Sequence, residues 1–168
     1  FSNYSTNQTI DLYRENGAGI TFPRGLIKDL FQIIPNIRVE DQTTTNPVKF
    51  PESRIELRPY QEKAVAAMME RNQGILVMPP GAGKTVSAIE AVIRRGQKTL
   101  VLVHTKDLKE QWLNRFKTFT GITPGVIDDK NFDTEHPVII GMVQTLTGRR
   151  LTEDFLKSFG CVILDEGH

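Results

Sequence analysis

An apolar run followed by a glycine-rich loop constrains this chain more than any other feature. Residues 75–77 are apolar, residues 78–85 read Met-Pro-Pro-Gly-Ala-Gly-Lys-Thr, and a helical pattern begins near Val86. Glycines permit a tight turn, and the N–H groups that open the next helix carry roughly half a positive charge. The pattern predicts a strand, a phosphate-binding loop and a helix in succession.

Two side chains complete this loop. Lys84 supplies a mobile cation for the outer phosphates of a bound triphosphate, and the Thr85 hydroxyl can ligate the accompanying Mg²⁺. A generic loop of this type has glycine where this chain has Met78. An ordinary Pro-Gly turn is the alternative interpretation, which the following Lys-Thr pair disfavours. The other loop residues predicted to contact the nucleotide are Pro80, Gly81, Ala82 and Gly83.

A second apolar run, residues 161–164, ends in Asp165 and Glu166. Buried parallel strands are short apolar runs, and functional groups gather at their carboxyl ends. Asp165 would then face Thr85 across the metal ion, and Glu166 would orient or deprotonate an attacking water, a contribution of about a hundred- to ten-thousandfold. Taken alone, the pair could be a solvated loop. Together with Lys84 it predicts one catalytic centre, in which Lys84 and Glu166 are the catalytic residues.

The rest of this region alternates between strand-like and helical patterns. Such alternation implies an α/β fold, with a parallel sheet covered by helices on both faces. The expected strands are residues 99–103, 122–127 and 137–140, and the expected helices start at Pro59, at Val86 and near Leu108.

Several motifs in a fixed order resemble those of a known family. Residues 57–61 resemble the adenine-recognising segment of repair and branch-migration helicases and restriction-enzyme motors. Residues 100–112 and 138–146 resemble the family's two segments that contact the nucleic-acid backbone, and residues 165–168 are similar to its Asp-Glu-Ala-His box. This family often replaces the first loop glycine, as this chain does. The chain therefore resembles the first motor domain of a superfamily two helicase or translocase.

The resemblance implies a RecA-like ATP-binding motor domain over residues 53–168, incomplete at its C-terminal end, after a small mixed accessory segment and linker over residues 1–52. It implies ATP and Mg²⁺ as cofactors, and it adds Arg58 and Gln61 to the nucleotide-binding residues. The residues that it implies for nucleic-acid contact are Thr105, Lys106, Gln144 and Thr145.

The expected function is an ATP-dependent motor that moves on nucleic acid, with DNA favoured over RNA. The family's second RecA-like domain carries an arginine worth about a thousand- to a hundred-thousandfold in turnover. We therefore expect this chain alone to bind ATP and to hydrolyse it very slowly. The alternative is a nucleotide-binding subunit or interaction module of a restriction-type complex.

The composition limits which partners, disulfides and membrane segments the chain could have. The net charge of +1 does not reveal a polyanionic partner, which needs a local patch. A basic cluster on the helix after residue 105 could be that patch or an ordinary solvated face; its members are Lys106, Lys109, Arg115 and Lys117. Cys161 is the single cysteine, which excludes a disulfide framework. No apolar run approaches the roughly 20 residues of a membrane span. We expect a cytoplasmic protein, and a nucleus would fit equally.

Overall fold

The computed structural model describes residues 14–15, 17, 19–22, 24–36, 38–39 and 43–166. The chain divides into two compact units, Phe1–Asp41 and Gln42–His168. In the smaller unit, strands β1 (Arg14–Glu15) and β2 (Ile20–Thr21) pair antiparallel, and a short 3₁₀ turn leads into helix α1 (Ile27–Ile33). This is the small mixed segment that the sequence predicts.

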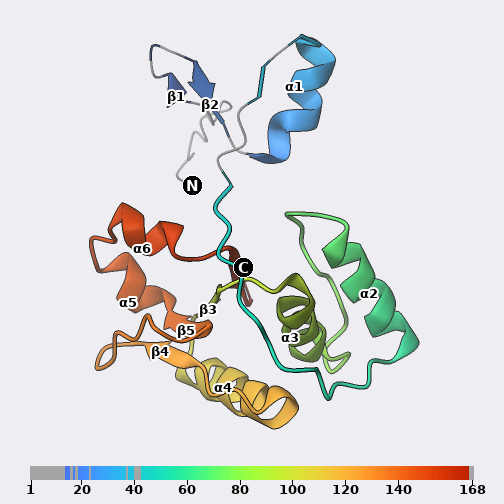
Figure 1. The fold of residues 1–168 in the computed structure, drawn as a ribbon, viewed down its shortest axis with the longest axis vertical. Helices are drawn as coiled ribbons and strands as arrows, with labels where there is room; N and C mark the ends of the chain where they lie inside the picture. The colour runs from blue at the N-terminus through green and yellow to red at the C-terminus, as the bar shows by residue number, and fades with distance from the viewer. Residues whose placement is uncertain are drawn as a thin grey trace, which may run out of the picture. The chain divides into compact units, whose positions relative to one another are not determined.

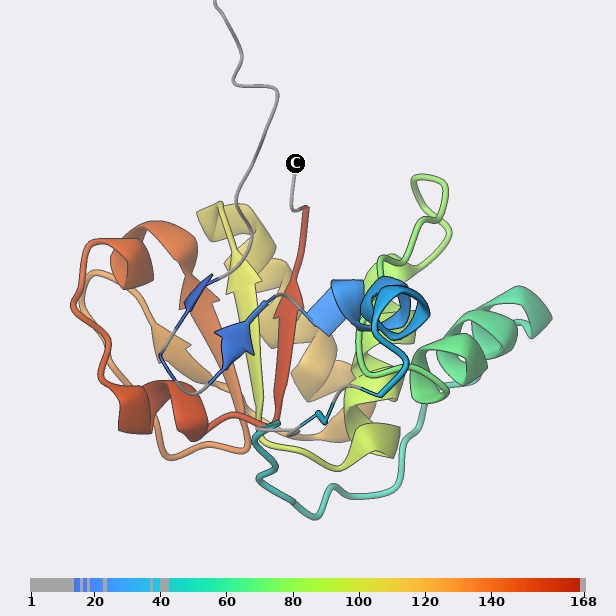
Figure 2. The ribbon, with the colours of Figure 1, turned by 90° about the horizontal axis from the view of Figure 1, so that it is seen from above.

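A four-stranded parallel sheet forms the centre of the larger unit, in the order β4-β5-β3-β6. Figure 2 shows these strands side by side. The predicted parallel sheet is therefore confirmed. The strands are β3 (Thr99–Val103), β4 (Gly125–Ile127), β5 (Val138–Met142) and β6 (Cys161–Leu164).

Helices cover both faces of this sheet (Figures 1 and 2). Because strand side chains alternate between faces, Val101 packs with α3 and α4, whereas its neighbour Leu100 packs with residues of α5 and of the α6 region. This is the predicted α/β sandwich. The helices are α2 (Pro59–Met69), α3 (Lys84–Arg95), α4 (Lys106–Thr120), α5 (Val143–Thr147) and α6 (Glu153–Lys157).

Local signals explain where the two longest helices begin and end. Helix α3 lies between Gly83 and Gly96, whose φ angles of 87° and 61° are left-handed and favour glycine. Helix α4 begins after Thr105, whose hydroxyl accepts a hydrogen bond from the Leu108 N–H at 3.2 Å, and it ends at Gly121.

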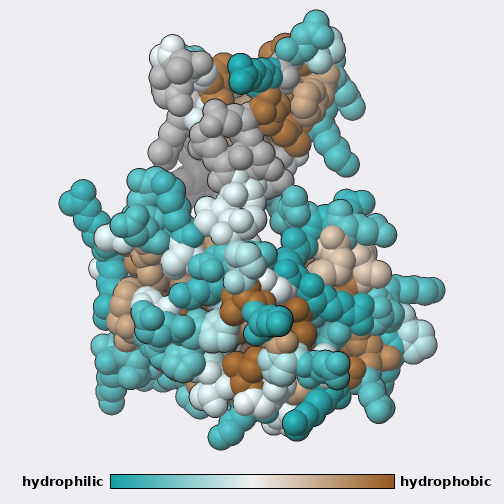
Figure 3. Space-filling model, in the orientation of Figure 1, coloured by the Kyte–Doolittle hydropathy of each residue, from teal (hydrophilic) through white to brown (hydrophobic). Residues whose placement is uncertain are grey.

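The strand predicted over residues 75–77 is wrong. The structure assigns no strand there, and Ile75 and Val77 are 92% and 86% exposed. A segment becomes a strand only when a neighbour supplies partners for its N–H and C=O groups, and none of the described strands pairs with this segment. At the sheet edge, Val162 and Leu164 of β6 are 58% and 52% exposed. The face of the molecule in Figure 3 is mostly hydrophilic, with separate apolar areas.

Residues 43–50 make contacts within the larger unit. The Asn46 N–H donates to the Gln97 side chain at 2.6 Å, its side-chain amide donates to the Ser158 carbonyl at 2.7 Å, and the Val48 N–H donates to the Gly96 carbonyl at 2.9 Å. The structure thus groups this segment with the sheet, whereas the sequence assigns residues up to 52 to the linker. No helix in the described ranges has the length and apolar character to cross a bilayer.

Candidate nucleotide-binding site

The glycine-rich loop leads directly into helix α3. Gly81 and Gly83 both have left-handed φ angles, 74° and 87°, and the Ala82 N–H donates to the Pro79 carbonyl at 3.2 Å. The Lys84 ammonium donates to the Met78 carbonyl at 3.2 Å, so it lies over its own loop. The loop therefore has the tight turn and the helix N-terminus of the predicted phosphate site.

The loop and the acidic pair border one cleft of about 550 Å³. The sequence-predicted residues on its wall are Pro80, Gly81, Gly83, Lys84, Thr85, Asp165 and Glu166. Helix α4 adds Leu108, Gln111, Arg115 and Phe119 to the lining of the cleft. Arg115 thus lies at this cleft, whereas the sequence grouped it with the basic residues of the nucleic-acid track.

The acidic pair follows strand β6. The Asp165 N–H donates to the Leu102 carbonyl of β3 at 3.0 Å, and Asp165 Oδ2 accepts a hydrogen bond from the Trp112 indole Nε1–H at 2.7 Å. Glu166 is exposed and has a φ of 53°, in the left-handed region that few non-glycine residues adopt. Trp112 is buried in the core, and its bond to Asp165 could not be predicted from the sequence, because its partner is far away along the chain.

Two side chains at the cleft, those of Thr85 and Asp165, could serve as oxygen ligands of a magnesium ion. They are too few to hold a metal ion without other ligands. Thr85 is buried in the first turn of α3, and both Thr85 and Asp165, whose side chains carry oxygen atoms, line the cleft. Within the described residues, no three His, Cys, Asp or Glu side chains gather as a metal cluster. Mg²⁺ needs only one or two protein oxygens when phosphates and waters complete its shell.

The two residues that the resemblance adds to the nucleotide-binding set, Arg58 and Gln61, lie at the start of α2. Gln61 is buried: its Oε1 accepts from the Arg58 N–H, and its Nε2 donates to the Ala82 carbonyl, both at 2.9 Å. The Tyr60 hydroxyl also donates to Ala82, at 3.2 Å. A side chain at Gly83 would collide with Gln61 Nε2. Gln61 therefore holds the phosphate loop, and its contact with adenine stays a prediction.

A second cleft, of about 210 Å³, lies at the carboxyl ends of β4 and β5 and at the start of α4. Three of the four residues predicted to contact nucleic acid border it: Lys106, Gln144 and Thr145. Gln144 Nε2 donates to the His104 carbonyl at 2.8 Å, and this bond joins α5 to the end of β3. The fourth residue, Thr105, caps α4 beside Lys106.

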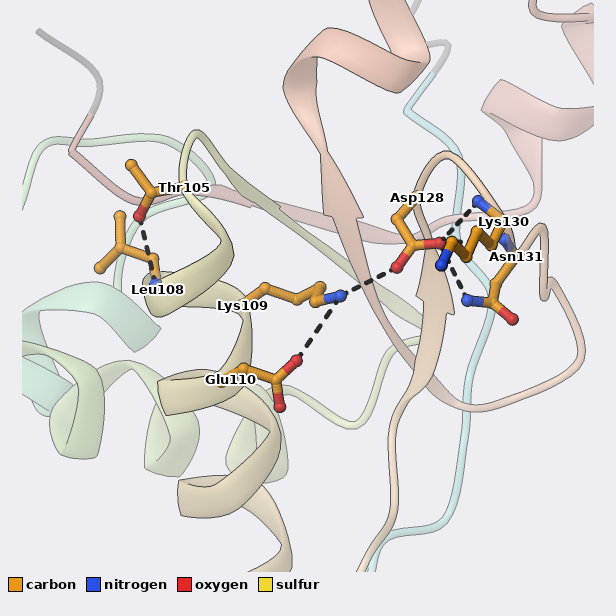
Figure 4. A network of polar contacts seen from close by, with 7 residues as sticks. All are labelled: Thr105, Leu108, Lys109, Glu110, Asp128, Lys130 and Asn131. Carbon is orange, nitrogen blue, oxygen red and sulfur yellow. Dashed lines mark hydrogen bonds and ion pairs between the residues drawn. The ribbon is translucent and has the colours of Figure 1, made fainter.

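An ion pair borders this second cleft (Figure 4). Lys109 Nζ lies 2.8 Å from Asp128 Oδ2, while Asp128 Oδ1 accepts hydrogen bonds from the Lys130 N–H and from the backbone and side chain of Asn131. The hydrogen bond from Lys109, with these further donors, holds the pKa of Asp128 well below its usual range, and Asp128 raises the pKa of Lys109. The positive charge of Lys109 is therefore balanced by Asp128, whereas Lys106 is exposed. The sequence showed Asp128 only as part of a polar loop.

The sequence is similar to that of a known family and of several helicases and translocases. Residues 54–168 match the family described as "Type III restriction enzyme, res subunit". A protein of Acanthamoeba polyphaga mimivirus that carries the name of an ATP-dependent RNA helicase is 33% identical over 98% of this chain and 32% of its own length. The DNA 3'-5' translocase XPB2 of Sulfurisphaera tokodaii is 33% identical over 79% of this chain and 30% of its own length.

A third relative is the helicase/translocase subunit XPB of general transcription and DNA repair factor IIH from Dictyostelium discoideum. It is 30% identical over 80% of this chain and 18% of its own length. The chain thus spans about a third or less of the length of these relatives. The family match covers more than half of the chain, and it shows that the chain belongs to the type III restriction enzyme res-subunit family, within superfamily two of helicases and translocases.

Proposed function

We propose that this chain is the ATP-binding motor domain of a nucleic-acid helicase or translocase. The observation that carries the proposal is the shared cleft, because it brings the phosphate-binding loop of α3 beside the acidic pair at the end of β6. A nucleoside triphosphate needs cationic and N–H groups for its phosphates and carboxylates for its metal and its attacking water. This cleft holds both sets.

The roles follow from the positions of the side chains. Lys84 and the N–H groups that open α3 would bind the phosphates, and Thr85 and Asp165 would hold Mg²⁺. When bound, Mg²⁺ neutralises developing negative charge on the phosphates. Glu166, exposed at the cleft, would orient the attacking water.

Nucleic acid would bind along the second cleft. Lys106, an exposed cation among the described residues, borders this cleft, and Gln144 and Thr145 add hydrogen-bonding groups to its lining. We favour DNA, because the XPB relatives are named as DNA enzymes, although the mimiviral relative is named for RNA. A second RecA-like domain would supply the arginine needed for rapid turnover. A cytoplasmic location fits the lone cysteine.

A restriction-type complex is the second candidate. The family description refers to the res subunit of such an enzyme, and the same cleft would then drive a motor subunit within a larger assembly. The nucleotide chemistry is common to both candidates. Cleavage of DNA in an assembly that contains this chain would favour the restriction complex, whereas movement without cleavage would favour the helicase.

Nucleotide binding by the 168-residue chain tests the proposal. Anisotropy of a fluorescent ATP analogue should show saturable binding, and Lys84→Ala should weaken it at least about tenfold, because the cation for the outer phosphates is lost. Glu166→Gln should bind as tightly as the wild type, since its carboxylate acts on water. Lys49, exposed and distant from the loop in sequence, provides a matched lysine control. Equal weakening by Lys84→Ala, Lys49→Ala and Glu166→Gln would contradict these roles.

A further inference from the structure

Trp112, the single tryptophan of the chain, connects the core to Asp165, which follows strand β6. Trp112 is 1% exposed, and its indole N–H donates to Asp165 Oδ2 at 2.7 Å. A buried indole N–H needs an acceptor. A carboxylate acceptor makes the bond charge-assisted and roughly twice as strong as a neutral hydrogen bond. If Trp112 served only to fill the apolar core, its indole N–H would not be needed.

Two elements hold Asp165 in place. Its backbone N–H is bonded to Leu102 of β3, and its carboxylate is bonded to Trp112 of α4. Among the residues that the structure describes, no hydrogen bond engages the second carboxylate oxygen, Oδ1. Because Asp165 borders the nucleotide cleft, the indole fixes one oxygen and leaves the other available there.

Trp112 does not itself border the cleft, although Leu108, Gln111 and Arg115 of the same helix do. It therefore has no direct contact with a nucleotide in that cleft. Trp112 can therefore influence the cleft only by orienting the Asp165 carboxylate. Partners that hydrogen-bond to metal ligands typically change metal affinity about ten- to a hundredfold.

We propose that Trp112 is a positioning residue for the nucleotide site: its indole N–H orients the Asp165 carboxylate toward the magnesium ion of the bound nucleotide. This inference rests on the proposed function, because it takes Asp165 as the magnesium ligand. Trp112 also belongs to α4, which begins at the second cleft. The orientation of Asp165 is thereby tied to the position of the helix expected to contact nucleic acid.

A purely structural role for Trp112 makes a different prediction. Trp112 packs against Phe116 with 6.1 Å between ring centroids, and both side chains are buried in the same core cluster. If packing were the whole role, truncating either ring would lower stability and leave the effect of magnesium on nucleotide affinity unchanged. Phe116 is thus a matched control, since it is an aromatic residue of the same helix with no polar atom.

The first experiment compares the wild type, Trp112→Phe and Phe116→Leu in the 168-residue chain. Dissociation constants for a fluorescent ATP analogue are measured in Mg²⁺ and in EDTA. We expect magnesium to tighten binding in the wild type and in Phe116→Leu, and this gain to fall about tenfold in Trp112→Phe while affinity in EDTA is unchanged. The same gain in all three proteins would overturn the inference. A wild type that binds nucleotide in neither condition would instead refute the proposed function.

A second measurement covers the case in which Trp112→Phe fails to fold. Trp112 is the single tryptophan, so the emission of the wild type reports on its surroundings. Titrating Mg²⁺ into the ATP-bound chain should shift this emission, because the charge of the bonded carboxylate becomes shared with the ion. Asp165→Asn should abolish the shift. An emission spectrum that magnesium leaves unchanged in the ATP-bound wild type would overturn the inference.

Discussion

Replacing Asp128 with asparagine should destabilise the fold, because it leaves the largely desolvated ammonium of Lys109 beside an uncharged partner. The two side chains are 9% and 13% exposed, and their charged atoms lie 2.8 Å apart. Removing one member of a buried ion pair costs about 3–5 kcal/mol of unfolding free energy. Asparagine keeps one acceptor oxygen, and Glu110 lies 3.5 Å from Lys109, so we expect the lower end of the range, about 3 kcal/mol.

Thermal unfolding followed by circular dichroism measures this loss. For a chain of this length, each kcal/mol shifts the midpoint by about 2–4 °C, so Asp128→Asn should lower it by about 6–12 °C. Asp129→Asn is the matched control, because Asp129 is the exposed neighbour, and it should change stability by less than about 0.5 kcal/mol. Equal midpoints for the two variants would refute the reasoning.

Acid should reduce the difference between the wild type and Asp128→Asn. The pKa of Asp128 in the folded chain lies below its value in the unfolded chain, mainly because Lys109 donates to it. Its stabilising contribution is therefore full above the unfolded-state pKa of about 3.9 and is lost as the pH falls toward the folded-state value. In unfolding free energies measured from pH 7 downward, this difference should begin to shrink below about pH 4 and go on shrinking as the pH falls further. A difference that grows in acid would contradict the assignment.

Two further variants test the clefts. Gly83→Ala should lower stability and nucleotide affinity more than Gly81→Ala: both positions have left-handed φ angles, which cost alanine about 1–2 kcal/mol, but only at Gly83 would the new atom collide with Gln61. Equal thermal midpoints would show that Gln61 simply moves aside. In the complete protein, Lys106→Ala should reduce the slope of log affinity for DNA against log salt by about one, whereas Lys117→Ala should leave it unchanged. The opposite order would place the DNA elsewhere.

The parts of the fold that depend on local signals could be predicted from the sequence. The run 99–103 became a strand with its predicted bounds, and the glycine-rich loop makes the predicted tight turn because its glycines adopt left-handed backbone angles. The cleft shared by the phosphate loop and the acidic pair could be expected in advance, because functional groups gather at the carboxyl ends of parallel strands and the pair follows β6.

Features that depend on distant partners could not be predicted in this way. Residues 75–77 are as apolar as a buried strand, yet only a neighbouring strand could have made them one. The bond between Trp112 and Asp165 joins residues far apart in the chain, and an aromatic stripe indicates burial without naming a hydrogen-bond partner. Asp128 became important because its loop is folded against Lys109, which no local pattern shows.

The order of the strands has a consequence for synthesis on the ribosome. Strand β3 is the first of the four to be made, yet its two neighbours, β5 and β6, come much later in the chain. Both edges of an apolar strand are therefore bare while the intervening helices emerge, and unpaired edges invite association with other chains. We therefore expect nascent chains of this protein to be most prone to aggregation during that interval, when a chaperone that shields β3 would protect them most.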